Sequence, residues 1–350
     1  MATYMNAWTS NRYTMYPFST QNAKDYQNLM AVYLDAVFFP RLDKYDFFQE
    51  GWRLEHEDPE DLTTPLKFKG VVFNEMKGDM SSTEKIYYAK YLQALFGNCA
   101  DGYYSGGEPL EIVKKLTWKR LLEYHKSFYH PTNSRFFTYG DLPLESHLQY
   151  IDDNILSNFS YHPIVVERNE KCWTASREIR MDCPFDPNLP EDRQIRASLN
   201  WPLPKVSSVY GHFSRRVVSD LLLLGSSSPL YQALIKTHIG TSFSPLIGYN
   251  PGPTVPVFSI GLQGLKEEAL EEMQIRIKET LTKCLTDQNL QANYGGLLHS
   301  YELERRQEVA SFGLKLAANL MEFWCKGYNM SELLDTRGHL RRVREELANN

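Results

Sequence analysis

Histidines, cysteines and carboxylates are the residues of this chain that could carry out metal or acid–base chemistry. The nine histidines are scattered without the spacing of a zinc site, and the closest pair, His125 and His130, is five residues apart and lies off one helical face. The five cysteines include no C-x-x-C pair, which is typical of reduced thiols inside cells. Residue types and spacing alone therefore supply no complete catalytic set.

One carboxylate stands out because of its surroundings. Residues 68–78 read F-K-G-V-V-F-N-E-M-K-G, so the apolar patch Val71–Phe73 leads directly into Glu75. An ionised carboxylate beside buried surface must be solvated, paired or bound to a metal, because an unpaired buried charge costs several kcal/mol. The simplest interpretation places Glu75 on the wet side of an amphipathic helix, and a metal ligand is the alternative.

Two other motifs favour structural roles. The loop Gly102–Gly107 lacks the G-x-G-x-x-G or Walker layout of a phosphate-binding loop. The run Ser226–Ser228 lacks the glycine elbow of a hydrolase and is better explained as helix capping.

Composition narrows the class of protein. The chain has 350 residues, of which 42% are hydrophobic, so it can bury large cores and has room for about two domains. Its net charge of -5 argues against nucleic acid as a partner. No apolar run reaches the length of a membrane span, and the N-terminus has the layout of neither a secretory signal nor a transit peptide.

Periodicity and turn residues predict the elements that must position these side chains. We expect strands over residues 2–18 (as two strands or a hairpin), 135–139, 177–181, 194–201, 243–249 and 257–262. We expect helices over residues 22–39, 45–53, 81–96, 117–130, 144–159, 209–224, 229–235 and 266–287, and further helix to the end of the chain.

The order of these elements predicts an α+β fold. Each half alternates short antiparallel-type strands with long helices, which favours two consecutive domains of helices packed on one face of a mainly antiparallel sheet. We predict that residues 1–160 form the later part of a first domain, that 161–190 form a linker, and that 191–350 form a second domain, which we expect to be incomplete.

Nine sequence blocks occur in order along nearly the whole chain. They are residues 5–9, 13–19, 49–55, 68–78, 105–109, 129–131, 135–140, 228–235 and 258–264. Together these blocks resemble the presequence-degrading members of the pitrilysin and insulinase family of zinc metallopeptidases.

This resemblance implies roles for named residues. The family binds one zinc ion through the two histidines of an H-x-x-E-H motif, whose Glu is the general base, and through a Glu on a later helix. That later Glu corresponds to Glu75, which becomes the expected metal ligand. The segment Asn6, Ala7, Trp8 and Thr9 resembles the family's active-site edge strand, on which an unfolded peptide adds as an extra strand. An ordinary sheet strand is the alternative for these four residues.

The chain also departs from the family. No H-x-x-E-H occurs between Met1 and Asn350, so no catalytic residue is expected within it. The resemblance therefore implies a fragment of a zinc metalloendopeptidase that lacks the H-x-x-E-H segment and the C-terminal half, and that is inactive alone. The complete form would be a mitochondrial matrix monomer that closes around unfolded peptides such as cleaved presequences. The alternative is a non-catalytic peptide-binding or assembly subunit that keeps the fold without the metal site.

Overall fold

The computed structural model describes residues 2–97, 99–164, 175–252, 255–287, 290–307 and 309–348. The chain forms two compact units, Met1–Gln93 with Gly102–Asn169, and Ala94–Asp101 with Glu170–Asn350. The predicted linker at 161–190 contains the boundary, although its residues 165–174 lie outside the described parts. The assignment of the two units as peptidase-like domains stays a prediction.

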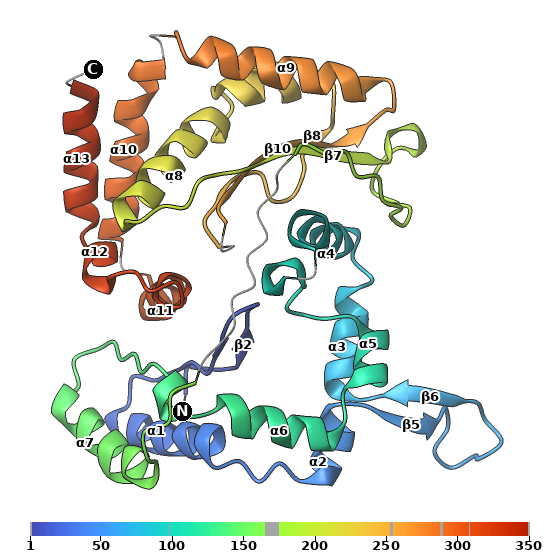
Figure 1. Ribbon diagram of the computed structural model, residues 1–350, viewed down its shortest axis with the longest axis vertical. Helices are drawn as coiled ribbons and strands as arrows, with labels where there is room; N and C mark the ends of the chain where they lie inside the picture. Colours follow the sequence, from blue (N-terminus) through green and yellow to red (C-terminus); the bar gives the residue numbers. More distant parts are fainter. Residues whose placement is uncertain are drawn as a thin grey trace. The chain divides into compact units, whose positions relative to one another are not determined.

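The first unit begins with a hairpin and continues mainly as helix (Figure 1). Its strands are β1 (Tyr4–Met5), β2 (Trp8–Thr9), β3 (Thr14–Met15), β4 (Phe18–Ser19), β5 (Arg53–His56) and β6 (Leu66–Lys69). Its helices are α1 (Ala23–Phe38), α2 (Lys44–Glu50), α3 (Val71–Asp79), α4 (Thr83–Phe96), α5 (Pro109–Lys115), α6 (Trp118–Phe128) and α7 (Leu144–Asn154). The last residues of α4 belong to the second unit.

Side-chain caps and long-range hydrogen bonds define the helices of the first unit. Asn22 accepts from the Asp25 amide at the start of α1, and Thr117 accepts from the Arg120 amide at the start of α6. Trp118 Nε1 donates to the Leu42 carbonyl at 2.7 Å, which ties α6 to the segment after α1. These caps agree with the predicted starts of both helices.

The ladder of β5 and β6 has two chemically different faces. Arg53, Glu55 and Lys69 lie on one face, where Arg53 and Lys69 are 2.6 and 3.6 Å from the Glu55 carboxylate. Leu54 and Phe68 pair on the other face and remain 54% and 38% exposed. The sequence interpretation missed this ladder.

The second unit is built on one antiparallel sheet. Its strands are β7 (Ile195–Pro202), β8 (Ser242–Phe243), β9 (Gly248–Asn250) and β10 (Val257–Leu265). Strand β10 is central, with β7 on one side and β8 and β9 on the other. Its helices are α8 (Val209–Leu223), α9 (Ala269–Cys284), α10 (Leu290–Arg306), α11 (Phe312–Trp324), α12 (Met330–Leu334) and α13 (Thr336–Ala348), with a π-helical turn at Tyr231–Ile235.

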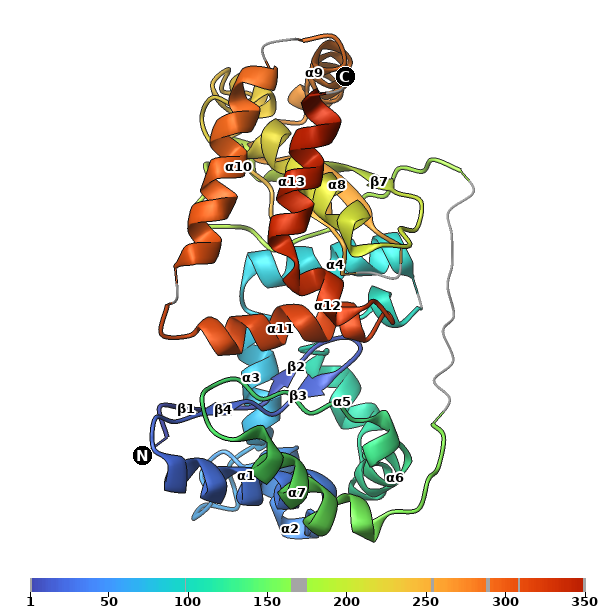
Figure 2. The same ribbon diagram turned by 90° about the vertical axis from the view of Figure 1, so that its left-hand side faces the viewer.

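Helices α8 and α9 cover one face of this sheet (Figure 1). The buried core between them contains Ile260 and Leu262 of β10, Leu222 of α8, and Met273 and Ile277 of α9. A second apolar cluster joins α8 to α10 and α13, which lie side by side (Figure 2). The arrangement agrees with the predicted α+β class of helices packed on a sheet face.

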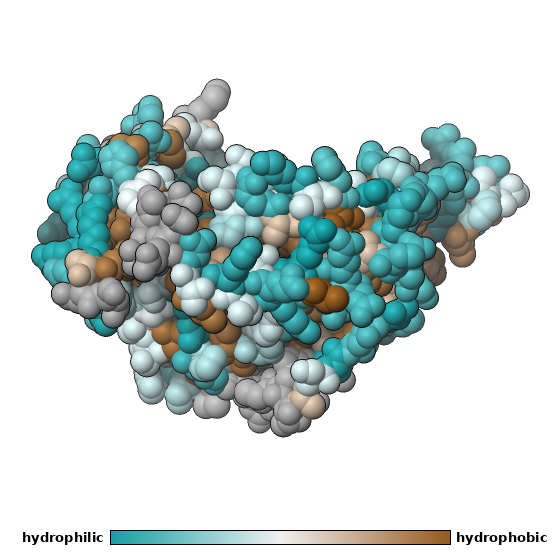
Figure 3. Space-filling model, turned by 90° about the horizontal axis from the view of Figure 1, so that it is seen from above, coloured by the Kyte–Doolittle hydropathy of each residue, from teal (hydrophilic) through white to brown (hydrophobic). Residues whose placement is uncertain are grey.

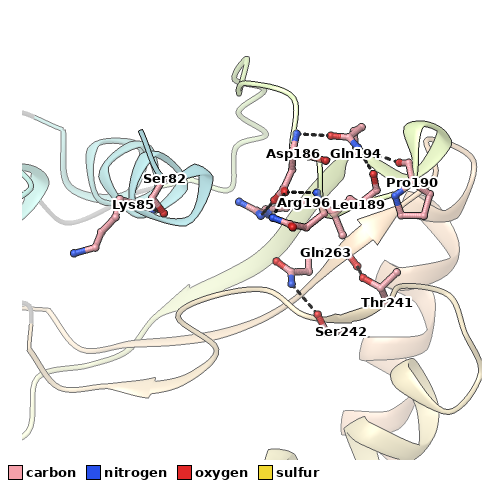
Figure 4. Close-up of polar contacts among 11 residues, drawn as sticks. Ser82, Lys85, Asp186, Leu189, Pro190, Gln194, Arg196, Thr241, Ser242 and Gln263 are labelled. Atoms are coloured by element: carbon pink, nitrogen blue, oxygen red, sulfur yellow. Dashed lines mark hydrogen bonds and ion pairs between the residues drawn. The ribbon is translucent and has the colours of Figure 1, made fainter. Parts of the chain in front are cut away.

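A polar network fixes the chain that enters β7. The Gln194 side chain accepts from the Asp186 amide at 2.8 Å and donates to the carbonyls of Asp186, Leu189 and Pro190 (Figure 4). Arg196 pairs with the Asp186 carboxylate at 2.5 Å, and both side chains are about nine-tenths buried. Residues 186–190 are therefore held firmly to the first turn and strand of the second unit.

Two predicted strands are wrong, and a third, residues 243–249, is interrupted by a turn at residues 245–246. Residues 135–139 and 177–181 have no strand structure. A strand requires ladder hydrogen bonds to a neighbour, and no described segment pairs with either of them. A local preference for strand therefore does not supply a pairing partner.

The face seen in Figure 3 is mostly hydrophilic, and its apolar patches are interrupted by hydrophilic side chains. Within the described residues, no helix is both long enough and apolar enough to cross a bilayer.

His212 of α8 is a buried histidine that is bonded through both ring nitrogens. Its Nε2 is 2.7 Å from the Tyr328 hydroxyl, and its Nδ1 is 2.6 Å from the Tyr249 hydroxyl. Because Tyr328 donates its proton to the Val206 carbonyl, it accepts from Nε2–H, and Nδ1 accepts from Tyr249. Burial, together with the charges of Lys326 and Arg215, lowers the His212 pKa to about 4. The network therefore holds His212 neutral.

This pKa predicts acid sensitivity of the second unit. An unfolded histidine titrates near pH 6.5, so between about pH 6.5 and 4 the unfolded chain binds more protons than the folded one. The free energy of unfolding should fall as the pH is lowered through this window and should be unaffected by His212 above it. Urea unfolding at pH 7 and pH 5 should show this loss, and it should shrink in His212→Gln but not in the exposed control His299→Gln. An unchanged pH dependence in His212→Gln would contradict the assignment.

Candidate functional site

Helix α3 begins where two stretches of backbone cross. Gly70 precedes the helix with φ of 148°, and a Cβ atom on it would lie 2.2 Å from the carbonyl oxygen of Gly51. The Phe73 amide donates to that same oxygen at 3.4 Å, and the Asn74 amide donates to the Gly70 carbonyl at 3.0 Å. Glycine is required at position 70 because other residues have neither the space nor the conformation. The crossing fixes the first turn of α3 to the segment before β5.

The two sides of α3 differ in burial. Phe73 and Met76 are 6% and 7% exposed and pack into the first unit, whereas Glu75 is exposed on the other side. The expectation that the Glu75 carboxylate is held against buried surface is therefore corrected, because the helical period turns Glu75 away from Phe73 and Met76. Val71 and Val72, one turn before Glu75, are 45% and 40% exposed, so the carboxylate lies on a partly apolar outer face.

The described residues do not fit a complete zinc site. They contain no group of three or more His, Cys, Asp or Glu side chains that could hold a metal ion. Catalytic zinc in proteins takes three protein ligands and a water molecule. Glu75 offers one carboxylate on a fixed helix, and the described residues do not complete a three-ligand set around it.

Of residues 6–9, Trp8 and Thr9 form β2, and Asn6 and Ala7 connect β1 to β2 on the same side of the N-terminal hairpin. Tyr4 and Met5 pair with Ser19 and Phe18, and Trp8 and Thr9 pair with Met15 and Thr14, so one register runs through the hairpin. The Asn6 amide donates to the Pro17 carbonyl at 3.1 Å. Because main-chain groups alternate in direction along an antiparallel strand, those of Met5, Ala7 and Thr9 point to the opposite edge. Among the described strands, none pairs with that edge.

The Asn6 side chain occupies part of this edge. Its Oδ1 accepts from the Ala7 amide at 2.8 Å, and its Nδ2 donates to the Tyr4 hydroxyl at 3.3 Å. Trp8 Nε1 donates to the same hydroxyl at 2.7 Å. Asn6 thus covers an amide that an added strand would otherwise use.

Both predicted features belong to the first unit. Among the described residues, no hydrogen bond or ion pair joins Glu75 to residues 6–9. The two features are an exposed carboxylate and an open strand edge, without a direct polar contact between them in the described residues.

The sequence interpretation missed the side chains that hold the far end of α3. Tyr104 donates from its hydroxyl to Asp79 Oδ2 at 2.6 Å, and Lys85 Nζ donates to the Tyr104 hydroxyl at 3.1 Å. Lys85 also pairs with Asp79 at 3.5 Å. The one available signal was that Asp79 follows Glu75 by four residues and so lies on the same side of the helix.

Comparison with known proteins assigns the family. The family described as Peptidase M16 inactive domain matches residues 115–292, which is half of the chain. The chain is also similar over its whole length to "Presequence protease, mitochondrial" of Xenopus tropicalis, at 42% identity over 353 residues. This chain belongs to the M16 peptidase family.

Other relatives agree with the assignment. Proteins of the same name from Mus musculus and Schizosaccharomyces pombe are 41% and 38% identical over 100% and 95% of this M16 chain. The family resemblance seen in the sequence is therefore confirmed, and the names place these relatives in the mitochondrion, the location expected here. The chain spans 34% of the length of each of these three relatives.

Solved structures support the fold. A protease from Helicobacter pylori matches with a TM-score of 0.62 at 15% identity, over 97% of this chain and 79% of that one. A peptidase M16 inactive domain from Pseudomonas fluorescens matches with a TM-score of 0.65 at 13% identity, over 97% of this chain and 74% of that one. The predicted α+β class of the M16 fold is confirmed.

The backbone crossing predicts opposite effects for two glycines of the α3 region. Gly70→Ala should lower the free energy of unfolding by more than about 2 kcal/mol, because it combines strain with a clash against backbone. Gly78→Ala should raise it by about 0.5–1 kcal/mol, since a Cβ at Gly78 meets no atom within 4 Å and alanine favours helix. Urea unfolding of both variants measures the difference. Equal effects would contradict the crossing.

The incomplete ligand set predicts weak metal binding by the chain itself. The purified 350-residue protein should bind zinc no better than a surface carboxylate does, because one carboxylate is not a catalytic site. Metal content after dialysis measures this. Retention of equimolar zinc would show that the ligand set is larger than the described residues indicate.

Proposed function

We propose that this chain is part of a zinc metalloendopeptidase of the mitochondrial matrix that degrades unfolded peptides, such as cleaved presequences. The observation that carries the proposal is the exposed Glu75 carboxylate on a fixed helix, in a chain 42% identical from end to end to a presequence protease. The chain covers about a third of such a relative, so its contribution is partial.

Glu75 would be one zinc ligand, and the rest of the site would come from an H-x-x-E-H segment that this sequence does not contain. Bound zinc would supply a Lewis acid and an activated water for hydrolysis. The chain's own part is to present a carboxylate in a fixed direction, because the Gly51–Gly70 crossing and buried Phe73 and Met76 hold α3. Without the missing ligands we expect the chain to be inactive.

Residues 6–9 would bind the substrate backbone. An unfolded peptide can add to the open edge at Met5, Ala7 and Thr9 through main-chain hydrogen bonds, which select for extended chains rather than for a sequence. The Asn6 side chain would have to release the Ala7 amide when the peptide docks. The complete form would close around this peptide as a monomer.

A non-catalytic peptide-binding or assembly subunit is the second candidate. One observation favours it: the described residues contain no group of three or more His, Cys, Asp or Glu side chains that could hold a metal ion. Two measurements on a longer form that includes an H-x-x-E-H segment separate the candidates: its zinc content and its cleavage of peptides. A non-catalytic subunit would neither bind zinc nor cleave peptides.

The metal role of Glu75 is tested in such a longer form. Glu75→Gln keeps the size of the side chain but removes the charge that balances zinc, and should lower zinc affinity or peptide turnover by at least about 10 to 100-fold. Glu84→Gln, an exposed residue of α4, should stay within about 0.5 kcal/mol of the parent. Metal content and peptide cleavage are measured for both variants. Full zinc content and full turnover in Glu75→Gln would show that Glu75 is not a zinc ligand.

A further inference from the structure

A three-residue cluster, Asp79, Lys85 and Tyr104, lies at the C-terminal end of α3. Tyr104 comes from the loop before α5, and Lys85 comes from the first turn of α4. The Tyr104 hydroxyl donates to Asp79 Oδ2 at 2.6 Å and accepts from Lys85 Nζ at 3.1 Å. Burial and the bond to Asp79 raise the pKa of Tyr104, so its hydroxyl remains a donor. The cluster therefore joins α3, α4 and the loop through one phenol.

The same loop also contacts the buried side of α3. Gly107 has φ of 70°, and a Cβ atom on it would lie 2.5 Å from Met76 Cε. Gly106 lies directly against the Tyr104 ring, since its Cβ would be 2.4 Å from Cε1. The Tyr104 ring also packs edge-on against Tyr88 of α4, with 5.6 Å between centroids. The loop therefore contacts α3 at two residues, Met76 and Asp79, which are three positions apart along the helix.

We propose that Tyr104 is a positioning residue, which acts with Asp79 and Lys85 to fix the end of α3 and hence the direction of the Glu75 side chain. The proposal rests on the proposed function of Glu75. The Gly51–Gly70 crossing holds only the first turn of α3, and the nine-residue helix needs a second fixed point. Tyr104 provides that point through a single hydroxyl group.

The cluster also distinguishes the two carboxylates of α3. Asp79 lies one turn beyond Glu75 on the same side of the helix, where a free carboxylate would compete for a cation. Its Oδ2 is engaged by Tyr104 and Lys85, whereas Glu75 is exposed and, among the described residues, forms no ion pair. Glu75 is therefore the carboxylate that α3 offers to a ligand.

Tyr104→Phe tests the role of the cluster in the 350-residue chain, because it removes only the hydroxyl and keeps the ring that packs on Tyr88 and Gly106. Hydrogen exchange of the last turn of α3, including the Met80 amide that bonds to the Met76 carbonyl, should become about fivefold faster. Exchange in α9 should be unchanged. Tyr103→Phe, at the exposed neighbouring residue, is the matched control and should leave α3 exchange as in the parent. Unchanged exchange in Tyr104→Phe would overturn the proposal.

A second measurement separates positioning from local stability. In a longer form with an H-x-x-E-H segment, Tyr104→Phe should weaken zinc affinity about 10-fold, measured by chelator competition, with the KM for peptide unchanged. Asp79→Asn keeps an oxygen that accepts from Tyr104 and should retain more zinc affinity than Asp79→Ala. Faster exchange with parental zinc affinity would reduce Tyr104 to a structural role and overturn the proposal. A separate result would contradict the proposed function itself: full zinc binding by Glu75→Gln in a protein that retains Tyr104.

Discussion

The contact between the backbones of Gly51 and Gly70 is the constraint on which the first unit depends. It brings the end of α2, the ladder of β5 and β6, and the first turn of α3 to one point, where no side chain fits. Burial of Phe73 and Met76 then fixes the rotation of α3 about its axis, so that Glu75 faces outward. The outward rotation of α3 thus follows from two glycines and two apolar side chains, and the cluster of Asp79, Lys85 and Tyr104 holds the other end of the helix.

Much of the fold could be predicted from local signals. Asn22 and Thr117 cap helices at the predicted places, and the alternation in residues 194–201 matches β7 closely. The β5–β6 ladder was missed because its signal, alternating charged and apolar residues in Arg53–His56 and Leu66–Lys69, is interrupted by the turn between them. The strands predicted at 135–139 and 177–181 failed for a different reason, since a local preference for strand cannot supply a pairing partner.

The candidate site was harder to predict from the sequence than the fold. The candidate roles of Glu75 and residues 6–9 were inferred from resemblance to a family. The ligands of a metal site come from distant segments of the chain, and a single carboxylate forms no motif that could be recognised by its spacing. The position of Glu75 on the solvent side agrees with the simpler interpretation of its helix. The contact between Asp79 and Tyr104 spans 25 residues and depends on the path of a loop, so the spacing of Asp79 from Glu75 indicates a side of the helix but not this partner.

The two-faced ladder of β5 and β6 has a consequence for local opening. An isolated two-stranded ladder is marginally stable in water, and this one leaves Leu54 and Leu66 54% and 58% exposed. Its tip is closed by short turn bonds, such as that from Thr64 Oγ1 to the Asp61 carbonyl. We therefore expect the ladder to be among the first parts of the unit to open, with a free energy of opening well below the free energy of global unfolding. Since β6 runs directly into Gly70, opening of this hairpin reaches the residue at which the two backbones cross beneath α3.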